Sequence, residues 1–254
     1  MRLDLYLVEK GYFDSRTKAK QAIERGEVYL DNTVVSKSSL EISEDKKQKI
    51  NIVSPESFVS LGGYKLNKAL NSFLLDVNGL IIADIGASTG GFTDCALQRG
   101  AKKVYAVDLN DSLLSKKLQK DDRVVPIIKN ARDLRVEDFD DRIDLIVADL
   151  SFISATYVLE TFSKLIDDEG KIILLIKPQF EIFEKRKFKN GIVKDTKLHR
   201  EICENIFSYA HKCNLFPIGF TSAPKTEGKN MEFLVLFSKN EKDKLIDISS
   251  INYS

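Results

Sequence analysis

The sequence predicts an α/β protein in which a small α+β domain precedes a larger domain built on a doubly wound, mainly parallel sheet. From about residue 80 onward, short apolar runs alternate with helical stretches, as expected when helices cover both faces of a parallel sheet. The first fifty residues instead combine two short amphipathic segments with a hairpin pattern. A chain of 254 residues has room for one to two domains at roughly 150 residues each.

The composition excludes several classes of protein. With 43% hydrophobic and 30% charged residues, the chain is neither disordered nor membrane-spanning, and its apolar runs of about five residues are far shorter than the roughly 18 that a bilayer requires. Charged residues directly after Met1 differ from a secretory signal. Lys and Arg number 39 against 38 Asp and Glu, a net charge of +1, which argues against a wholly polybasic protein. We therefore expect a cytoplasmic protein with no membrane partner.

Cysteine and histidine give no sign of a metal site or a disulfide framework. The three cysteines form no Cys-x-x-Cys pair, and their odd number fits a reduced setting. His199, Cys203, His211 and Cys213 follow one another in a segment with an apolar stripe. Their order matches no usual zinc spacing. We predict that this segment is a helix and that no metal is bound.

The head of the chain predicts two helices, a hairpin and a closing strand. Residues 3–8 form the first helix; Asp14-Ser15 supplies an N-cap for a second helix over 16–25, and Gly26 ends it. A hairpin over 28–35 and a strand over 50–53 follow. The second helix carries four basic residues and one acidic residue. Such a run is either a solvated face or a surface that contacts phosphates.

The remaining chain predicts a linker, a large domain and a polar tail. We place the head at 1–54, the linker at 55–60, where Pro55 breaks the pattern, the large domain at 61–240 and the tail at 241–254. Parallel strands are expected at 80–85, 104–107, 124–128, 143–148 and 172–176. The run 231–237 alternates in the manner of an edge or antiparallel strand.

A glycine-rich turn follows the first of these strands. Its spacing over residues 84–94 is Gly-x-x-x-Gly-Gly, whereas the dinucleotide fingerprint is Gly-x-Gly-x-x-Gly. Asp108 ends the next strand and is placed to accept hydrogen bonds from both hydroxyls of a ribose. This combination favours S-adenosylmethionine, which has no pyrophosphate to cradle. NAD binding and a ligand-free strand–helix turn are the alternatives.

Four motifs resemble the TlyA family: DIGASTGGFTDC at 84–95, GAKKVYAVD at 100–108, DLSFIS at 149–154 and KPQFE at 177–181. The head pattern of RLD at 2–4, SRTKA at 15–19 and IERG at 23–26 resembles the RNA-binding module of small-subunit ribosomal protein S-four. This resemblance implies a Rossmann-like, FtsJ-like methyltransferase domain behind that module. It also implies 2′-O-ribose methylation of ribosomal RNA, on cytidine within a ribosomal subunit, with S-adenosylmethionine as methyl donor. A monomer is favoured.

The resemblance also implies site residues. The Lys-Asp-Lys-Glu tetrad of ribose 2′-O-methyltransferases falls on Lys65, Asp149, Lys177 and Glu232, and Lys177 is the candidate general base. A second lysine and the cofactor's sulfonium would favour its uncharged form, which the two carboxylates would oppose. The implied cofactor-binding residues are Asp84, Gly86, Ser88, Gly90, Phe92, Asp108, Asn130 and Asp149. The implied RNA-binding residues are Arg2, Arg16, Lys18, Lys20 and Arg25. Independently of the resemblance, Asp149 and Lys177 both end apolar strands at the ligand-binding edge, and the cost of burying an unpaired charge there predicts that they pair with each other.

Some positions depart from the family pattern. Leu61 stands where a basic residue is usual, Leu109 and Asn110 follow Asp108, and the segment 225–230 lacks two glycines. Two other functions remain open at this point. One is a membrane-active haemolysin, a label that the family has carried, although no basic amphipathic helix is evident. The other is a ribosome-assembly factor that binds RNA without catalysis, against which the intact tetrad argues.

Overall fold

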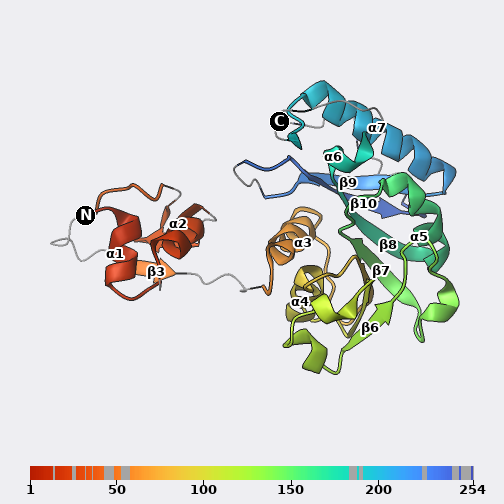
Figure 1. Cartoon of the computed structure of the whole chain (residues 1–254), viewed down its shortest axis with the longest axis horizontal. Coiled ribbons are helices and arrows are strands. Elements are labelled where there is room, and N and C mark those ends of the chain that lie inside the picture. The colour runs from red at the N-terminus through yellow and green to blue at the C-terminus, as the bar shows by residue number, and fades with distance from the viewer. Residues whose placement is uncertain are drawn as a thin grey trace. The chain divides into compact units, whose positions relative to one another are not determined.

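The chain divides into two compact units, which the computed structural model places at Met1–Ser57 and Phe58–Ser254 (Figure 1). We call them the head and the body. The described residues are 1–13, 15–24, 27–31, 33–35, 37–42, 49–52, 58–182, 188, 191–224, 228–241, 246 and 253. Within them, no helix is long and apolar enough to cross a membrane.

The head contains the helices and the hairpin that its sequence predicts. Helices α1 (Leu3–Glu9) and α2 (Arg16–Glu24) accompany a three-stranded antiparallel sheet. Its order is β2-β1-β3, with β1 at Val28–Leu30, β2 at Thr33–Val34 and β3 at Ile50–Ile52. Ser15 caps α2 as predicted, since its Oγ accepts a hydrogen bond from the Lys18 amide at 3.3 Å. The other predicted cap residues, Asp14 and Gly26, lie outside the described residues.

A small apolar core holds the head together. Buried side chains of both helices and of β1 meet in one cluster, which comprises Leu3, Leu7, Ala19, Ala22, Ile23, Val28, Leu30, Val35 and Ile42. The apolar positions of each helix recur at helical spacing, so one face of each turns inward. The opposite face of α2 carries its exposed basic residues.

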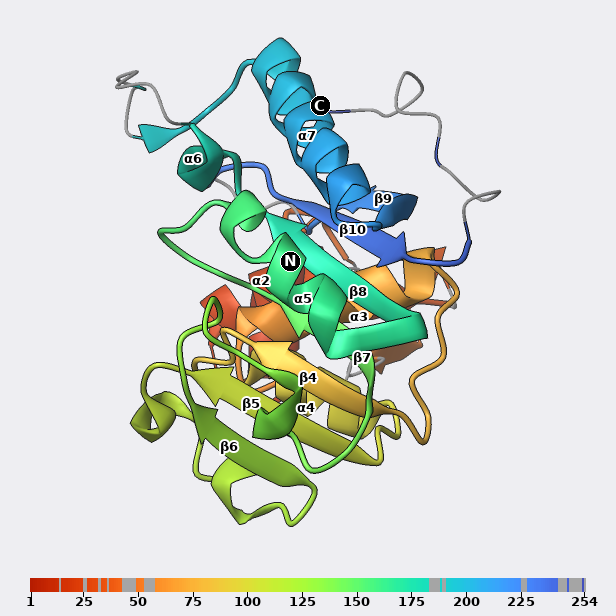
Figure 2. The ribbon, with the colours of Figure 1, turned by 90° about the vertical axis from the view of Figure 1, so that its right-hand side faces the viewer.

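The body is built on one seven-stranded sheet of order β6-β5-β4-β7-β8-β10-β9 (Figure 2). Its strands are β4 (Ile81–Ile85), β5 (Lys103–Asp108), β6 (Val124–Ile128), β7 (Ile143–Ala148), β8 (Ile166–Ile176), β9 (Phe216–Ser222) and β10 (Phe233–Ser238). The first five strands in this order are parallel, whereas β10 runs antiparallel to both of its neighbours. The five parallel strands are confirmed, as is the antiparallel direction of β10.

The prediction differs from the structure in its last two strands. β10 is flanked by β8 and β9, and all six of its residues are buried. β9 itself was not predicted. It contains Pro217 and Gly219, which weaken the strand pattern in a sequence but are tolerated in a strand at the edge of a sheet. β9 occupies that edge.

Helices cover both faces of the sheet, as the apolar runs predict. Helices α3 (Leu61–Ser72) and α4 (Gly91–Gln98) pack in one apolar cluster with Ile82, Val104 and Leu145. Helices α5 (Leu159–Leu165) and α7 (Thr196–Lys212) pack in the other, with Ala83 and Ile146. Since neighbouring strand residues point to opposite faces, the two clusters lie on opposite sides. Short elements complete the body: α6 (Pro178–Glu181) and the 3-10 helices η1 (Asp111–Leu113), η2 (Leu118–Lys120), η3 (Val136–Asp138) and η4 (Ala155–Tyr157).

Helix α7 carries His199, Cys203 and His211, and Cys213 directly follows it, so the question of a metal falls here. His199 and Cys203 are buried in it, and the two ring nitrogens of His199 face the carbonyl oxygens of Tyr253 and Val193 at 3.3 and 3.1 Å. Among the described residues, no group of three or more potential ligands could hold a metal ion. Tyr253 is only 4% exposed and packs in the α5–α7 cluster, so part of the 241–254 segment lies against the body.

Candidate active site

The predicted cofactor-binding and catalytic residues gather at one edge of the sheet. Gly86 follows β4, Asp108 ends β5, Asn130 follows β6, Asp149 follows β7 and Lys177 follows β8. These five strands are parallel, so their carboxyl ends share an edge. In open α/β sheets this edge carries the ligand-binding crevice.

The turn after β4 needs glycine at Gly86 and at Gly90. Both have left-handed backbone conformations, with φ of +84° and +89°. A Cβ atom on Gly86 would lie 2.8 Å from the carbonyl oxygen of Asp149, a contact that rigid backbone cannot relieve. The Gly86 and Ala87 amides donate to the carbonyl of Val107 at 2.9 and 3.0 Å. The turn is therefore held between β5 and the loop after β7.

Asp108 is fixed at the mouth of this turn. Its Oδ2 accepts a hydrogen bond from the Ser88 amide at 2.8 Å, and its Oδ1 accepts one from the Leu109 amide at 2.7 Å. The residue is half-buried, and each carboxylate oxygen has a second lone pair. Asp108 can thus accept further hydrogen bonds from hydroxyl groups. Asn130, one strand further out, accepts from the Arg132 amide at 3.0 Å.

Asp84 and Phe92 lie beneath the turn. Asp84 is 1% exposed, and its Oδ2 accepts from the amide and the hydroxyl of Thr93 at 2.8 and 2.6 Å. Its Oδ1 has no hydrogen-bond partner among the described residues, and burial raises the pKa of this carboxyl to about 7. Phe92 is 3% exposed in the cluster that α3 and α4 share. Both side chains shape the turn from below.

The cradle fits a nucleoside cofactor. At this turn the backbone of Gly86 leaves no room for a Cβ atom, Ser88 is exposed, and Asp108 offers a fixed carboxylate as hydrogen-bond acceptor. No basic side chain is needed there, because S-adenosylmethionine carries no phosphate.

The four tetrad residues form one chain of ion pairs. Lys177 Nζ lies 2.5 Å from Asp149 Oδ1, and Lys65 Nζ lies 3.7 Å from Asp149 Oδ2 and 2.6 Å from Glu232 Oε2. Their side chains are 10–21% exposed, with Lys177 the least exposed. Lys65 comes from α3, and Glu232 directly precedes β10 rather than starting it. The predicted mutual pairing is confirmed, and the cluster is electrically neutral.

Three further residues lie at or next to Lys177; the sequence motifs contain them, but no role was predicted for them. Lys177 Nζ donates to Ser151 Oγ at 2.8 Å and lies 5.8 Å from the centre of the Phe180 ring. Phe180 packs on Phe152 at 4.9 Å, and Phe152 is 89% exposed with φ of +63°. All three fall within three residues of Asp149 or Lys177. Their closeness to strand ends is the signal that could have identified them.

Glu181 ties together the two loops that carry Asp149 and Lys177. Its carboxylate accepts from Ser154 Oγ at 2.5 Å and from the Ala155 amide at 2.9 Å. Burial raises the pKa of this carboxyl. The loop after β7 is thereby joined to α6 after β8.

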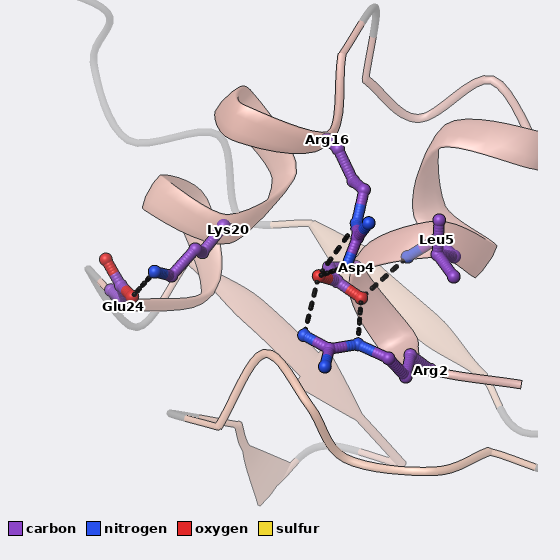
Figure 3. A network of polar contacts seen from close by, with 6 residues as sticks. All are labelled: Arg2, Asp4, Leu5, Arg16, Lys20 and Glu24. Carbon is purple, nitrogen blue, oxygen red and sulfur yellow. Dashed lines mark hydrogen bonds and ion pairs between the residues drawn. The ribbon is translucent and has the colours of Figure 1, made fainter.

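The predicted RNA-binding residues of the head differ in their surroundings (Figure 3). Arg2 and Arg16 both pair with Asp4, at 3.0 and 3.2 Å, which the sequence did not reveal. Lys20 pairs with Glu24 at 3.5 Å, one turn along α2. Lys18 is exposed on the same helix. Arg25 lies outside the described residues, as do the basic residues at 185–187 and 189.

Comparison with known protein families matches both units. Residues 58–239 match the FtsJ-like methyltransferase family, and residues 1–46 match the S4 domain. The chain is 40% identical to Hemolysin A of Brachyspira hyodysenteriae, over 93% of this chain and 99% of that protein. It is 35% identical to the protein named 16S/23S rRNA (cytidine-2′-O)-methyltransferase TlyA from Mycobacterium tuberculosis, over 88% of this chain and 84% of that protein.

A solved structure agrees with these matches. The crystal structure of a protein named as a hemolysin from Lactococcus lactis superposes with a TM-score of 0.71 at 39% identity, over 76% of this chain and 96% of that one. With its two family matches and this identity over most of its length, the chain belongs to the TlyA family, whose architecture here joins an S4 domain to an FtsJ-like methyltransferase domain.

Proposed function

We propose that this methyltransferase transfers the methyl group of S-adenosylmethionine to the 2′-oxygen of a ribose in ribosomal RNA. The observation that carries the proposal is the ion-paired chain of Lys177, Asp149, Lys65 and Glu232 beside the glycine turn. The name of the Mycobacterium tuberculosis relative, which specifies cytidine-2′-O methylation of 16S and 23S rRNA, supports a cytidine target.

The residues around the glycine turn would hold the cofactor. Asp108 would accept hydrogen bonds from the ribose hydroxyls of the cofactor. Gly86 and Ser88 would line its binding site, and Asn130 would lie near the cofactor's base. When bound, S-adenosylmethionine supplies a methyl group made electrophilic by the attached sulfonium. Asp84 and Phe92, which are buried at the turn, would support its shape.

Lys177 would remove the proton that the reaction must lose. A ribose 2′-hydroxyl is a weak nucleophile at neutral pH, so its proton has to leave as the new carbon–oxygen bond forms. The uncharged amine of Lys177 accepts that proton at Nζ, and the oxygen keeps the electron pair that binds the methyl carbon. Ser151 Oγ, at 2.8 Å from Nζ, and Asp149 fix the direction of the amine.

The other two tetrad residues would balance the charge around Lys177. Glu232 holds the Lys65 ammonium at 2.6 Å, and Lys65 in turn faces the second oxygen of Asp149 at 3.7 Å. Since Asp149 is shared between two lysines, its negative charge is not committed to Lys177 alone. The shared carboxylate thereby orients both lysines toward the same point of the site.

The head would supply affinity for RNA. An S4-type head with exposed basic residues on α2 suits the backbone of folded RNA, which proteins recognise through shape and phosphates. We propose that the substrate is a ribosomal subunit, that the enzyme acts as a monomer, and that it works in the cytoplasm where subunits assemble.

Methyl transfer to purified subunits tests this function. The protein and labelled S-adenosylmethionine are combined in three separate reactions. One contains small subunits, one contains large subunits and one contains protein-free ribosomal RNA. We expect label in the RNA of at least one subunit, mapped to a ribose 2′-oxygen. The methyl mark at the same position should be missing from the ribosomal RNA of cells that lack the gene.

Two outcomes would contradict the proposal. Subunit binding without any methyl transfer would indicate an assembly factor. Lysis of erythrocytes without cofactor, together with no transfer, would favour the membrane activity that the name of the Brachyspira relative suggests.

A further inference from the structure

Two carboxylates in the described part of the head are buried, Asp4 and Glu27, and the proposed chemistry uses neither. Asp4, in the first turn of α1, is 2% exposed. Its Oδ1 accepts hydrogen bonds from Arg2 Nε and the Leu5 amide, both at 3.0 Å. Its Oδ2 accepts from Arg2 Nη2 at 3.0 Å and from Arg16 Nε and Nη2 at 3.2 Å (Figure 3).

These contacts saturate the carboxylate. An ionised carboxylate offers about four lone-pair sites, and those of Asp4 are taken up by two guanidinium groups and one amide. A buried charge is tolerated only with such pairing. Hydrogen bonds from Arg2, followed by those from Arg16, lower the pKa of Asp4 below its ordinary value, so the group is ionised at neutral pH.

The two arginines remain open on their other side. Their side chains are 42% and 54% exposed, whereas that of Asp4 is 3% exposed. A guanidinium has five N–H donors, and each arginine uses its Nε and one Nη on Asp4. Toward the part of the chain that the structure describes, the other donors of both groups make no hydrogen bond, and the three residues together carry a net charge of +1, so this side can bind an anion.

Lys20 on the same helix provides a contrast. It pairs with Glu24 at 3.5 Å, and both side chains are 52% exposed. Such an exposed pair contributes little and holds its members loosely. Asp4 is instead fixed by burial in the core and by its amide, which donates to the Ser38 carbonyl at 3.2 Å. Of these two ion-paired groups in the described part of the head, the Asp4 cluster is therefore the one that holds its cationic groups in a fixed orientation.

We propose that Asp4 is a positioning residue that holds Arg2 and Arg16 as a preformed clamp for a phosphodiester of folded RNA. The planar donor fork of arginine matches phosphate geometry. An arginine that is already oriented loses less rotamer freedom when it binds. This inference rests on the proposed function, because it names the groups through which the head holds RNA.

The negative charge of Asp4 allows two explanations of RNA binding to be distinguished, orientation of the arginines and attraction by positive charge alone. Asp4→Asn removes one negative charge beside two arginines. If the surface attracted RNA by charge alone, the variant would bind more tightly. If Asp4 acts by orienting the arginines, the variant binds less tightly despite its greater positive charge.

The experiment compares full-length variants on purified bacterial ribosomal subunits over a range of salt concentrations. We expect Asp4→Asn to weaken binding by about tenfold, in view of the rotamer freedom of two arginines. The effect should fall on KM for the subunit rather than on kcat. Glu24→Gln is the matched control, since it removes the same charge from the loosely paired position on α2. It should bind as well as the wild type or slightly better.

A second variant keeps the test decisive if Asp4→Asn does not fold, which circular dichroism would reveal. Arg16→Lys preserves the charge and the Arg2–Asp4 pair but loses the two-pronged contact. We expect several-fold weaker binding. In an Arg2→Ala/Arg16→Ala background, Asp4→Asn should cause no further loss.

Unchanged or tighter binding by Arg16→Lys, or by folded Asp4→Asn, would overturn the clamp while leaving the proposed function intact. A wild-type protein that binds no subunit at all would overturn both.

Discussion

Asp4, buried in the head, and Asp84, one of the aspartates buried in the body, have carboxylates with opposite surroundings. Asp4 in the head faces two guanidinium groups, which lower its pKa. Asp84 in the body has only the amide and hydroxyl of Thr93 on one oxygen, and burial raises its pKa to about 7. The first serves to hold cations, and the second holds the start of a helix.

Asp149 lies in the body, as Asp84 does, and has cationic partners, as Asp4 does. It is partly buried and lies between two lysines, but those lysines are themselves screened from solvent, whereas the arginines of the head are not. Exposure of the cation therefore decides what each of these ion pairs can do. Open arginines can meet a second anion, whereas enclosed lysines can exchange a proton with a substrate that enters the site.

The largest effect is expected from Lys177→Ala, which tests the role of the enclosed lysine. Loss of a general base costs roughly 10²- to 10⁴-fold in rate, and binding of S-adenosylmethionine should stay within about twofold, since general-base loss acts on the chemical step. Single-turnover methylation of ribosomal subunits and calorimetric titration of the cofactor measure the two quantities. Lys171→Ala is a suitable control, because Lys171 lies on the same strand but pairs with Glu241. Near-wild-type methylation by Lys177→Ala would exclude Lys177 as the base.

Gly86→Ala tests whether the site in the body requires a residue without a Cβ atom at its turn. The Asp4 cluster in the head is built from side chains and has no such requirement. The new Cβ would combine a left-handed φ with a 2.8 Å approach to the Asp149 carbonyl. We expect a loss of about 3 kcal/mol in the free energy of unfolding, together with weaker cofactor binding. Gly79→Ala is the matched control, because Gly79 has φ of +76° with nothing within 4 Å. It should cost about 1 kcal/mol. Equal losses in urea denaturation of the two variants would show that the close approach is unimportant.

The pH dependence of stability separates the two aspartates most directly. The pKa of Asp84 is raised to about 7 on folding, so the folded state binds the proton more tightly. Its contribution to stability is complete below the unfolded pKa and is lost as the pH rises through about 7. Between pH 5 and 7 the free energy of unfolding should fall by about 2 kcal/mol through this group. The contribution of Asp4, whose pKa is lowered, is present above its unfolded pKa and is lost on acidification.

Urea denaturation at several pH values checks both signs. The decrease between pH 5 and 7 should disappear in Asp84→Asn and persist in Asp4→Asn. A wild-type protein whose stability rises steadily over this range, with the same slope in Asp84→Asn, would contradict the role given to Asp84.

Local patterns predicted most of the elements. The apolar runs from residue 80 onward identified the five parallel strands, and Ser15 identified the start of α2. β9 escaped because its Pro217 and Gly219 oppose the local strand preference. The fully buried position of β10 was not predicted either. The neighbours of a strand depend on which distant segments pair with it, and its own residues do not specify them.

The groups at the ends of the parallel strands could be predicted from the apolar runs alone, because the carboxyl ends of such strands meet at one edge of a sheet. That rule was enough to bring Gly86, Asp108, Asp149 and Lys177 together. Which charges pair and which remain exposed depends instead on how distant segments pack together. Lys65 reaches Glu232, far along the chain, through the packing of α3 against the sheet. Asp4 reaches Arg16 because two helices share a core, and burial of that carboxylate, which no local pattern encodes, leaves its arginines facing solvent.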